Sequence, residues 1–237
     1  GKFHLGINLE KGIANCWICG AKNLGSVLKR LGISIRLGKT RPRKEEEEEE
    51  EVKIEPPNNL CSLTENPFRG YIEGRGFDPE EIERVWGVKG IPIKWRLWIP
   101  VYQNNKLVAY TTRAIGNVSP RYISTGRIKK YLYGVNFCRN SIIVCEGPID
   151  VWRIGKGAVA TFGIPPSREQ LSKIASFPTR VFCFDSEAKA QEIAKLSAEK
   201  IRSYPGKTYI VKLDTGKDPA EAMEEEIDFL RKKFLRF

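Results

Sequence analysis

Short apolar runs alternate with helix-like segments from about residue 140 to the end of the chain. The runs have the length of strands: "IIVC" at 142–145, "AVAT" at 158–161, "VFCF" at 181–184 and "YIVKL" at 209–213. Strands that are apolar on both faces and are separated by helices indicate a parallel sheet covered by helices on both sides. The pattern therefore predicts an α/β fold for this part of the chain.

Three helices are predicted between these runs, beginning near Pro148, Ser167 and Glu187. Ser167 and Gln170 have the spacing of a capping box, which satisfies backbone N–H groups at the start of a helix. For the third helix we expect a buried face made of the apolar residues that recur at helical spacing: Ile193, Leu196, Ile201 and Tyr204.

The middle of the chain has a mixed pattern that predicts both helix and sheet. In "DPEEIERVWGV", Asp78 stands as the N-cap before Pro79 at the first helical position, which predicts a short helix. In "RLWIPVYQNNKLVAYTTRAI", two apolar and aromatic runs flank Asn104 and Asn105, and this pair predicts the turn of a β-hairpin. We interpret the region as a mixed α+β subdomain.

A charged segment, "KTRPRKEEEEEEEVKIEPPN" at 39–58, has almost nothing to bury and is predicted to be a linker. The linker separates an N-terminal module from the rest of the chain. This module is too small to be stable without an added cross-link such as a bound metal ion. We divide the chain into a module at 1–38, the linker at 39–58, the mixed subdomain at 59–137, the parallel-sheet subdomain at 138–220 and a C-terminal helix at 221–237.

Composition excludes two classes of protein. No run approaches the roughly 18 apolar residues of a membrane span, and the mean hydropathy is -0.37, so membrane insertion is not expected. The six cysteines form one close pair and four scattered singles, which is not a secreted disulfide framework. We expect a cytoplasmic protein, and because residue 1 is Gly, a chain that begins inside a longer natural protein.

The net charge of +11 understates the basic surface, because seven of the 29 acids lie in the run from Glu45 to Glu51. Without that run the rest of the chain carries +18. Such an excess favours a polyanion partner, most simply nucleic acid. A basic surface that only serves solubility would give the same count, so charge alone leaves both interpretations open.

Acidic residues follow three of the four predicted strands. Ligands of open parallel sheets bind beyond the carboxyl ends of the strands, so these acids are candidate site residues. Glu146 follows the first strand, with Asp150 in the next helical turn. Asp185 and Glu187 follow the third, and Asp214 and Asp218 follow the fourth.

The acids as a set favour a divalent metal site. Each acid alone has an ordinary structural explanation, as a helix-dipole partner, a cap or the start of a turn. Several carboxylates at one sheet edge of a basic chain, however, require neutralisation by a cation. Hard oxygen ligands suit Mg²⁺ or Mn²⁺, and paired ions of this kind catalyse phosphoryl transfer.

The pair Cys16 and Cys19 has the spacing of half a zinc ribbon, in which a tight turn presents two thiolates to one ion. A redox motif or coincidence would also produce this spacing. Its place in a module too small to fold unaided favours Zn²⁺. The sole histidine, His4, is a weak candidate for a further ligand.

These motifs carry a resemblance to a known family. The segment "FHLGINLEKGIANCWICG" resembles the second half of the zinc-binding domain of bacterial and phage DnaG-type primases. The stretches "GRGFDPEEIERVWGV", "IPVYQNNKLVAYTTRAIGNVSPRYIST" and "KYLYGVN" resemble that family's amino-terminal polymerase subdomain. The series "IIVCEGPIDVW", "ATFGIPPS", "VFCFDSEAKA" and "TGKDPAE" resembles its Toprim subdomain and is the most specific element.

The resemblance implies a DNA primase that synthesises short RNA primers on a single-stranded DNA template from nucleoside triphosphates. It implies that the family's metal-binding acids map onto Glu146, Asp150, Asp185, Glu187 and Asp218, with Glu146 as a metal ligand or general acid/base. It places Arg113, Arg121 and, more weakly, Arg75 where the family has basic residues that face template or nucleotide.

Three departures from the family pattern matter. Glu187 stands where an aspartate is usual, and Ala220 stands where an acid is usual, so we expect one metal to be held more weakly. The first pair of zinc ligands is absent, which we interpret as truncation before Gly1. No Walker motif is present, so we expect a replicative helicase as a partner or in a missing continuation.

Two other functions stay open at this point. A catalytically weakened Toprim DNA-binding module is the first, motivated by Ala220 and Glu187. The second is a Toprim nuclease or recombination factor with a zinc finger, which the polymerase-like segment at 70–137 argues against.

Overall fold

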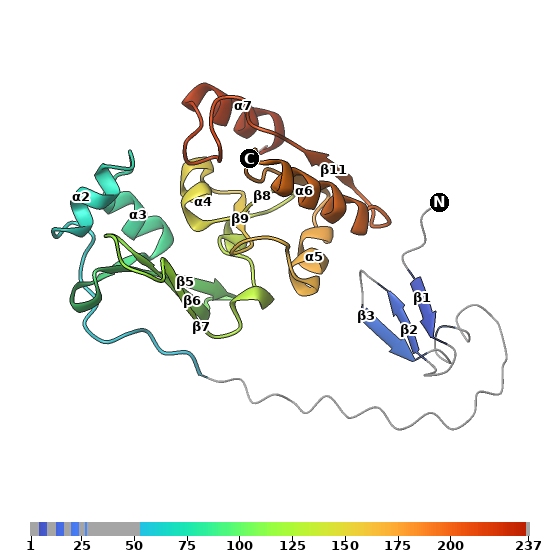
Figure 1. Ribbon diagram of the computed structural model, residues 1–237, viewed down its shortest axis with the longest axis horizontal. Coiled ribbons are helices and arrows are strands. Elements are labelled where there is room, and N and C mark those ends of the chain that lie inside the picture. The colour runs from blue at the N-terminus through green and yellow to red at the C-terminus, as the bar shows by residue number, and fades with distance from the viewer. Residues whose placement is uncertain (1–4, 9–12, 17–19, 24–26, 28–52, 236–237) are drawn as a thin grey trace.

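A computed structural model of the protein describes the strand residues 5–8, 13–16 and 20–23, residue 27, and residues 53–235. Three sheets organise these parts of the chain (Figure 1). Two are antiparallel, with strand orders β1-β2-β3 and β4-β5-β6-β7, and the third is parallel, with the order β11-β10-β8-β9. The α/β fold with a parallel sheet is therefore confirmed.

The N-terminal sheet consists of three short strands: β1 at Leu5–Asn8, β2 at Ile13–Cys16 and β3 at Gly20–Asn23. Cys16 is the last residue of β2, where it pairs with Leu5 on one side and Gly20 on the other. Cys19 and His4 lie outside the described residues, as does most of the predicted linker. The structure therefore leaves the predicted zinc ligands as a prediction.

The mixed subdomain contains α2 at Phe68–Glu73, α3 at Pro79–Trp86, β4 at Lys89–Ile91, the 3-10 turn η1 at Pro92–Lys94, β5 at Arg96–Gln103, β6 at Lys106–Ala114 and β7 at Tyr122–Thr125. The predicted hairpin is confirmed, with φ of 50° at Asn104 and 62° at Asn105. The predicted helix is confirmed too, and Asp78 accepts a 3.0 Å hydrogen bond from the Glu80 N–H.

The parallel-sheet subdomain follows two 3-10 turns, η2 at Ile128–Lys130 and η3 at Val135–Phe137. Its elements are β8 at Ser141–Cys145, α4 at Pro148–Ile154, β9 at Ala158–Ala160, α5 at Arg168–Ala175, β10 at Thr179–Phe182, α6 at Ala188–Lys200, β11 at Lys207–Ile210 and α7 at Glu224–Phe234. The strand order reverses between β8 and β10, so the ligand crevice of such a sheet is expected there.

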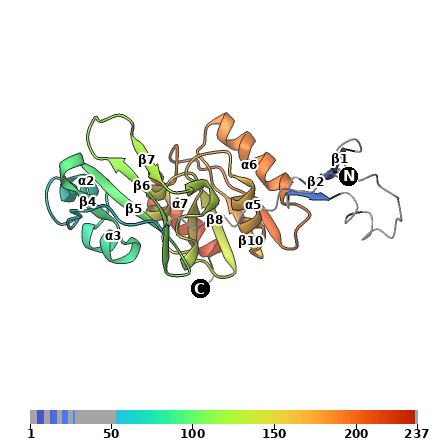
Figure 2. The same cartoon turned by 90° about the horizontal axis from the view of Figure 1, so that it is seen from below.

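Apolar residues pack against both faces of the parallel sheet. On one face, Ile143 and Val181 belong to a core that also contains Leu97 and Ile99 of β5. On the other face, Phe182 of β10 packs in a second core with Leu171 of α5. Figure 2 shows the result, with the sheet β4-β5-β6-β7 on one side of the parallel strands and α6 on the other. The shared core ties the two subdomains together.

Two details of the sequence prediction are wrong. Helix α6 ends at Lys200 and buries its small residues Ala190, Ala194 and Ser197, whereas Leu196 is 53% exposed. The other three predicted residues do reach the core, since Ile201 is buried and Ile193 and Tyr204 pack against it. Close packing of α6 on the sheet favours small side chains, which an apolar pattern does not register. The last strand ends at Ile210, and as an edge strand β11 is largely exposed rather than apolar on both faces.

None of the helices in the described part of the chain has the length and apolar character of a membrane span.

Candidate active site

Two of the predicted acids meet where the strand order of the parallel sheet reverses. Glu146 directly follows β8, and Asp185 follows β10 by three residues. Because Val144 and Phe182 are paired neighbours in the parallel register, the chain segments after these strands leave the sheet side by side. The backbone N–H of Asp185 donates a 3.3 Å hydrogen bond to Oε1 of Glu146.

Asp150 lies in the first turn of α4 and is only 6% exposed. Its Oδ2 accepts a 2.9 Å hydrogen bond from the Gly147 N–H, and its carboxyl also accepts one from the Ala220 backbone. Burial, together with the charge of Asp218, raises the pKa of Asp150 to about 8. Asp150 thus connects the turn after β8 to the segment that carries Asp218.

Asp218 and Glu187 bring further negative charge to the same edge. Burial and the charges of Glu146, Asp218 and Glu187 raise the pKa of Asp185 to about 7. Burial also raises the pKa of Glu146, and the charges of Glu187 and Asp218 act in the same direction. The structure therefore brings five predicted acids into one electrostatic cluster, which we call the acidic edge: Glu146, Asp150, Asp185, Glu187 and Asp218.

Asp214 lies apart from the acidic edge. It is exposed, and its backbone N–H donates a 2.9 Å hydrogen bond to Glu226 in α7. The carboxyl of Asp218 instead accepts a 2.9 Å hydrogen bond from the Glu221 N–H, which shapes the turn that follows. The long segment after β11 therefore brings Asp218, but not Asp214, close to the acids that follow β8 and β10.

The donor chemistry of the acidic edge fits a divalent metal ion. Carboxylates that repel one another in a half-buried place are stabilised by a cation, and oxygen ligands suit Mg²⁺ or Mn²⁺. In the described residues, no three histidine, cysteine or carboxylate side chains are close enough to enclose a metal ion. Mg²⁺ typically uses one or two carboxylates with water and substrate phosphates, which agrees with an open arrangement.

Lys129 is a charged neighbour of the acidic edge that the sequence analysis did not identify. Its Nζ donates hydrogen bonds to the carbonyls of Thr161 at 3.0 Å, Gly163 at 2.8 Å and Pro165 at 3.1 Å. Burial lowers the pKa of Lys129, and the charge of Glu146 partly offsets that effect. The sequence around Lys129 gives no signal of this placement, because the carbonyls that it contacts lie more than 30 residues away.

The three predicted arginines have different surroundings. Arg113 is 6% exposed and donates hydrogen bonds to the hydroxyls of Tyr71, at 2.6 Å, and Tyr122. Arg75 is exposed, with its guanidinium 5.1 Å from the centre of the Tyr71 ring. Arg121 is also exposed. Arg75 and Arg121 are therefore accessible to a ligand, whereas Arg113 holds two tyrosines in place.

Arg96 was also missed by the sequence analysis. It is 3% exposed and donates hydrogen bonds to the carbonyls of Pro120, at 2.6 Å, and Arg121, at 3.1 Å. Arg96 thereby fixes the backbone of the segment that presents Arg121.

A cavity of about 570 Å³ separates α2 from the parallel-sheet subdomain. It is lined by Gly70, Tyr71, Gly74, Arg75, Phe77, Ile149 and Ala220. Arg75 and Ala220 thus face one space, and the residue after Ile149 is Asp150. The cavity places an accessible arginine beside the acidic edge.

Comparisons with known proteins show what the chain is similar to. Residues 143–223 match the Toprim-like family model, which spans β8 to the segment after β11. A curated DNA primase of Treponema pallidum is 28% identical over 189 residues, which cover 70% of this chain and 31% of the relative. The chain therefore spans less than a third of that relative's length.

Two solved structures share the fold. The zinc-binding and RNA polymerase domains of the Aquifex aeolicus primase match with a TM-score of 0.63 and 17% identity, covering 98% of this chain and 75% of that one. A DnaG primase catalytic domain bound to single-stranded DNA matches with a TM-score of 0.60 and 19% identity, covering 73% and 74%.

The parallel-sheet subdomain is similar to the Toprim-like family and has an α/β fold. More specifically, the relatives and structural neighbours of the chain are DNA primases, and the resemblance to the DnaG-type primases is confirmed.

Proposed function

We propose that the chain is the catalytic part of a DNA primase that synthesises short RNA primers on single-stranded DNA by metal-dependent nucleotidyl transfer. The observation that carries the proposal is the acidic edge, where half-buried carboxylates from separate strand ends raise one another's pKa. The similarity to DNA primases is the reason for proposing primer synthesis as the reaction.

In this proposal Glu146, Asp185, Glu187 and Asp218 hold Mg²⁺ or Mn²⁺. The bound ions would supply activation of an attacking hydroxyl and neutralisation of phosphate charge. Glu146 is held by the Asp185 N–H and adjoins Gly147, where no side chain crowds a phosphate. Asp150, with its raised pKa, positions the Gly147 turn and is the group best suited to hold a proton near neutral pH.

The basic residues would bind the substrates. Arg75 and Arg121 are the accessible contacts for template or nucleotide, and Arg113 acts through Tyr71 and Tyr122. Template DNA, nucleoside triphosphates and a replicative helicase are the proposed partners, in the cytoplasm. A zinc ion held in part by Cys16 and Cys19 would complete the N-terminal module, as in primases that have a zinc-binding domain.

A catalytically weakened DNA-binding module is a second candidate. The observation in its favour is Ala220, whose small apolar side chain lines the cavity beside Arg75 where the resemblance leads us to expect an acid. A Toprim nuclease is less well supported, since the matched primase folds also cover the antiparallel sheet.

Primer synthesis tests the proposal directly. The chain is incubated with labelled ribonucleotides, Mn²⁺ and a mixed-sequence single-stranded template, and products are resolved by length. We expect short oligoribonucleotides whose synthesis Glu146→Gln reduces by at least 100-fold, with DNA binding nearly unchanged.

The matched control is Glu192→Gln, which removes an exposed acid from α6 and should leave synthesis intact. Strand cleavage without oligomer formation would favour the nuclease. Template binding without synthesis, when metal binding is demonstrated, would favour the binding module.

A further inference from the structure

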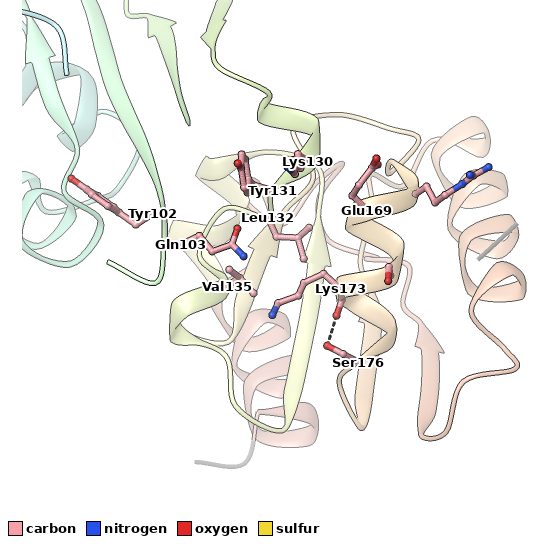
Figure 3. A pocket seen from close by; sticks show the side chains of 11 residues that line it. Tyr102, Gln103, Lys130, Tyr131, Leu132, Val135, Glu169, Lys173 and Ser176 are labelled. Atoms are coloured by element: carbon pink, nitrogen blue, oxygen red, sulfur yellow. Dashed lines mark hydrogen bonds between the residues drawn. The ribbon is translucent and has the colours of Figure 1, made fainter. Parts of the chain in front are cut away.

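A second cavity lies away from the acidic edge, between the end of β5, the turns η2 and η3, and helix α5 (Figure 3). Its volume is about 590 Å³. The residues that line it are Tyr102, Gln103, Lys130, Tyr131, Leu132, Val135, Arg168, Glu169, Ser172, Lys173 and Ser176. We call this space the α5 cavity.

Hydrogen bonds between distant segments hold the walls of the α5 cavity. The Asn136 amide donates to the Tyr102 carbonyl at 3.1 Å, which ties η3 to the end of β5. The buried Gln170 amide donates to the Tyr131 carbonyl at 2.7 Å, and the Ser167 hydroxyl donates to the Lys129 carbonyl at 2.6 Å. These bonds fix α5 against η2, so the cavity is formed before any ligand arrives.

Positive charge is in excess around the cavity, where Lys130, Arg168 and Lys173 face a single acid, Glu169. Neither Lys130 nor Lys173 forms an ion pair within the described residues. Figure 3 shows the Lys173 side chain reaching from α5 across the cavity toward Val135. Two unpaired ammonium groups thus border a space whose opposite wall is partly apolar.

The apolar wall consists of Leu132, which is buried, and Val135, which is half-buried. Tyr131 and the hydroxyls of Ser172 and Ser176 complete the lining. Apolar side chains can contact the face of a nucleobase, and cations with hydroxyls can bind a phosphate. This combination is the chemistry of a nucleotide within a strand.

Turn η2 has one lysine near the acidic edge and the next lysine in the lining of the α5 cavity. Lys129 and Lys130 are consecutive residues of η2. Lys129 bonds to carbonyls beside the acidic edge and is close enough to Glu146 for their charges to interact, whereas Lys130 lines the cavity. Turn η2 therefore connects the acidic edge to the α5 cavity.

We infer that the α5 cavity binds a segment of single-stranded nucleic acid, with phosphates between Lys130, Arg168 and Lys173 and a base against Leu132 and Val135. The inference rests on the proposed function only in requiring that a single strand be bound. It does not require catalysis, so EDTA can be present throughout the test and RNA synthesis is scored separately.

The test compares the affinity for a fluorescent single-stranded oligonucleotide over a range of salt concentrations. Lys130→Ser combined with Lys173→Ser should weaken binding about tenfold and reduce the log-log salt slope by about 1.4, because each lost phosphate contact contributes about 0.7. The matched control, Lys195→Ser combined with Lys232→Ser, removes two exposed lysines from α6 and α7 and should change the affinity by less than about twofold.

A cross-link locates the strand independently of affinity. An oligonucleotide that contains 4-thiothymidine should, on irradiation, become attached to peptides that include residues 130–135 or 168–176, and the lysine substitutions should reduce this product.

The inference is overturned if the cavity variant binds and cross-links like the control while the wild type binds DNA, or if the wild type binds no single strand. It is also overturned if a free nucleoside triphosphate, but not an oligonucleotide, protects these peptides from chemical modification. RNA synthesis without cavity-dependent binding would leave the proposed function intact and remove only this inference.

Discussion

The acidic edge and the surroundings of Arg96 and Arg113 arrange buried charge in opposite ways. In the parallel-sheet subdomain, like charges meet at the acidic edge and raise the pKa of Asp150 and Asp185 by burial and mutual repulsion. In the mixed subdomain, backbone carbonyls and tyrosine hydroxyls accept the hydrogen bonds of the buried cations Arg96 and Arg113. One region accumulates like charge that a ligand can neutralise, whereas the buried cations of the other have their hydrogen bonds satisfied within the protein.

This difference distinguishes residues that can bind a ligand from residues that stabilise the fold. A buried charge with complete hydrogen bonds stabilises its surroundings and has little left to offer a ligand. Carboxylates that repel one another destabilise the free protein and gain from any cation that binds. We therefore expect substitutions that remove charge to have opposite effects on stability in the two subdomains.

The largest effect is expected for Arg113→Ala. The substitution leaves the hydroxyls of Tyr71 and Tyr122 without their buried donor and creates a void. We expect the free energy of unfolding to fall by about 2–4 kcal/mol, measured by urea denaturation followed by tryptophan fluorescence.

The control for this prediction is Arg75→Ala, which removes only an exposed cation from the face of the Tyr71 ring. Its cost should be about 0.5–1 kcal/mol. Equal losses from the two variants would mean that Arg113 does not anchor this region.

Asp150→Asn should have the opposite sign. The pKa of Asp150 is about 8 in the folded state against an ordinary value of 3.8, so the folded protein binds more protons than the unfolded chain between these values. Stability therefore falls as pH rises through that window. The amide cannot ionise but keeps an acceptor for Gly147, so we expect a gain of about 1–2 kcal/mol at pH 8 in EDTA.

The same variant should show a smaller gain at pH 5, because the stability of the wild type falls progressively as pH rises from 3.8 to about 8 and most of that fall lies above pH 5. Thermal unfolding at both pH values checks the difference. A loss of stability at pH 8 would show that the hydrogen bond to Ala220 outweighs the relief of repulsion.

Divalent metal should stabilise the wild type by a similar or smaller amount. At a free Mg²⁺ or Mn²⁺ concentration of ten times Kd, linkage gives about 1.4 kcal/mol, or a rise in Tm of roughly 2–5 °C for a chain of this size. Asp185→Asn should remove most of the rise, and Glu192→Gln should not. An equal shift in both variants would place the ions elsewhere.

Local features of the fold could be predicted because their signals lie within a few residues. The Asn104-Asn105 turn, the Asp78 cap and the Ser167 capping box all appear where the sequence predicts them. The buried face of α6 could not be predicted in the same way, because the distance of a helix from its sheet decides between Ala194 and Leu196.

The candidate site could be predicted in part for a topological reason. Parallel strands direct their carboxyl ends to one edge, so Glu146 and Asp185 meet although 39 residues separate them. The partners of Arg113 and Lys129 follow no such rule, since Tyr71 lies 42 residues from Arg113 and Gly163 lies 34 residues from Lys129. Only packing reveals that Arg113 is internal while Arg121 is accessible.

The smallest effects should come from the two helix caps, one in each subdomain. The Ser167 hydroxyl accepts a hydrogen bond from the Gln170 N–H at 3.1 Å and donates one to the Lys129 carbonyl at 2.6 Å, and the Ser167 N–H donates one to Oε1 of Gln170 at 2.9 Å. Asp78 makes one cap bond, to the Glu80 N–H. Ser167→Ala therefore removes a cap and a tertiary contact and should lower the free energy of unfolding by about 1–1.5 kcal/mol. Asp78→Ala removes a cap alone and should lower it by about 0.5–1 kcal/mol.

Urea denaturation measures both losses, and Asp78→Asn and Ser167→Thr should recover most of each loss because they keep a side-chain acceptor. A larger loss from Asp78→Ala would mean that the bond to Lys129, and with it the docking of α5 on η2, contributes little to stability.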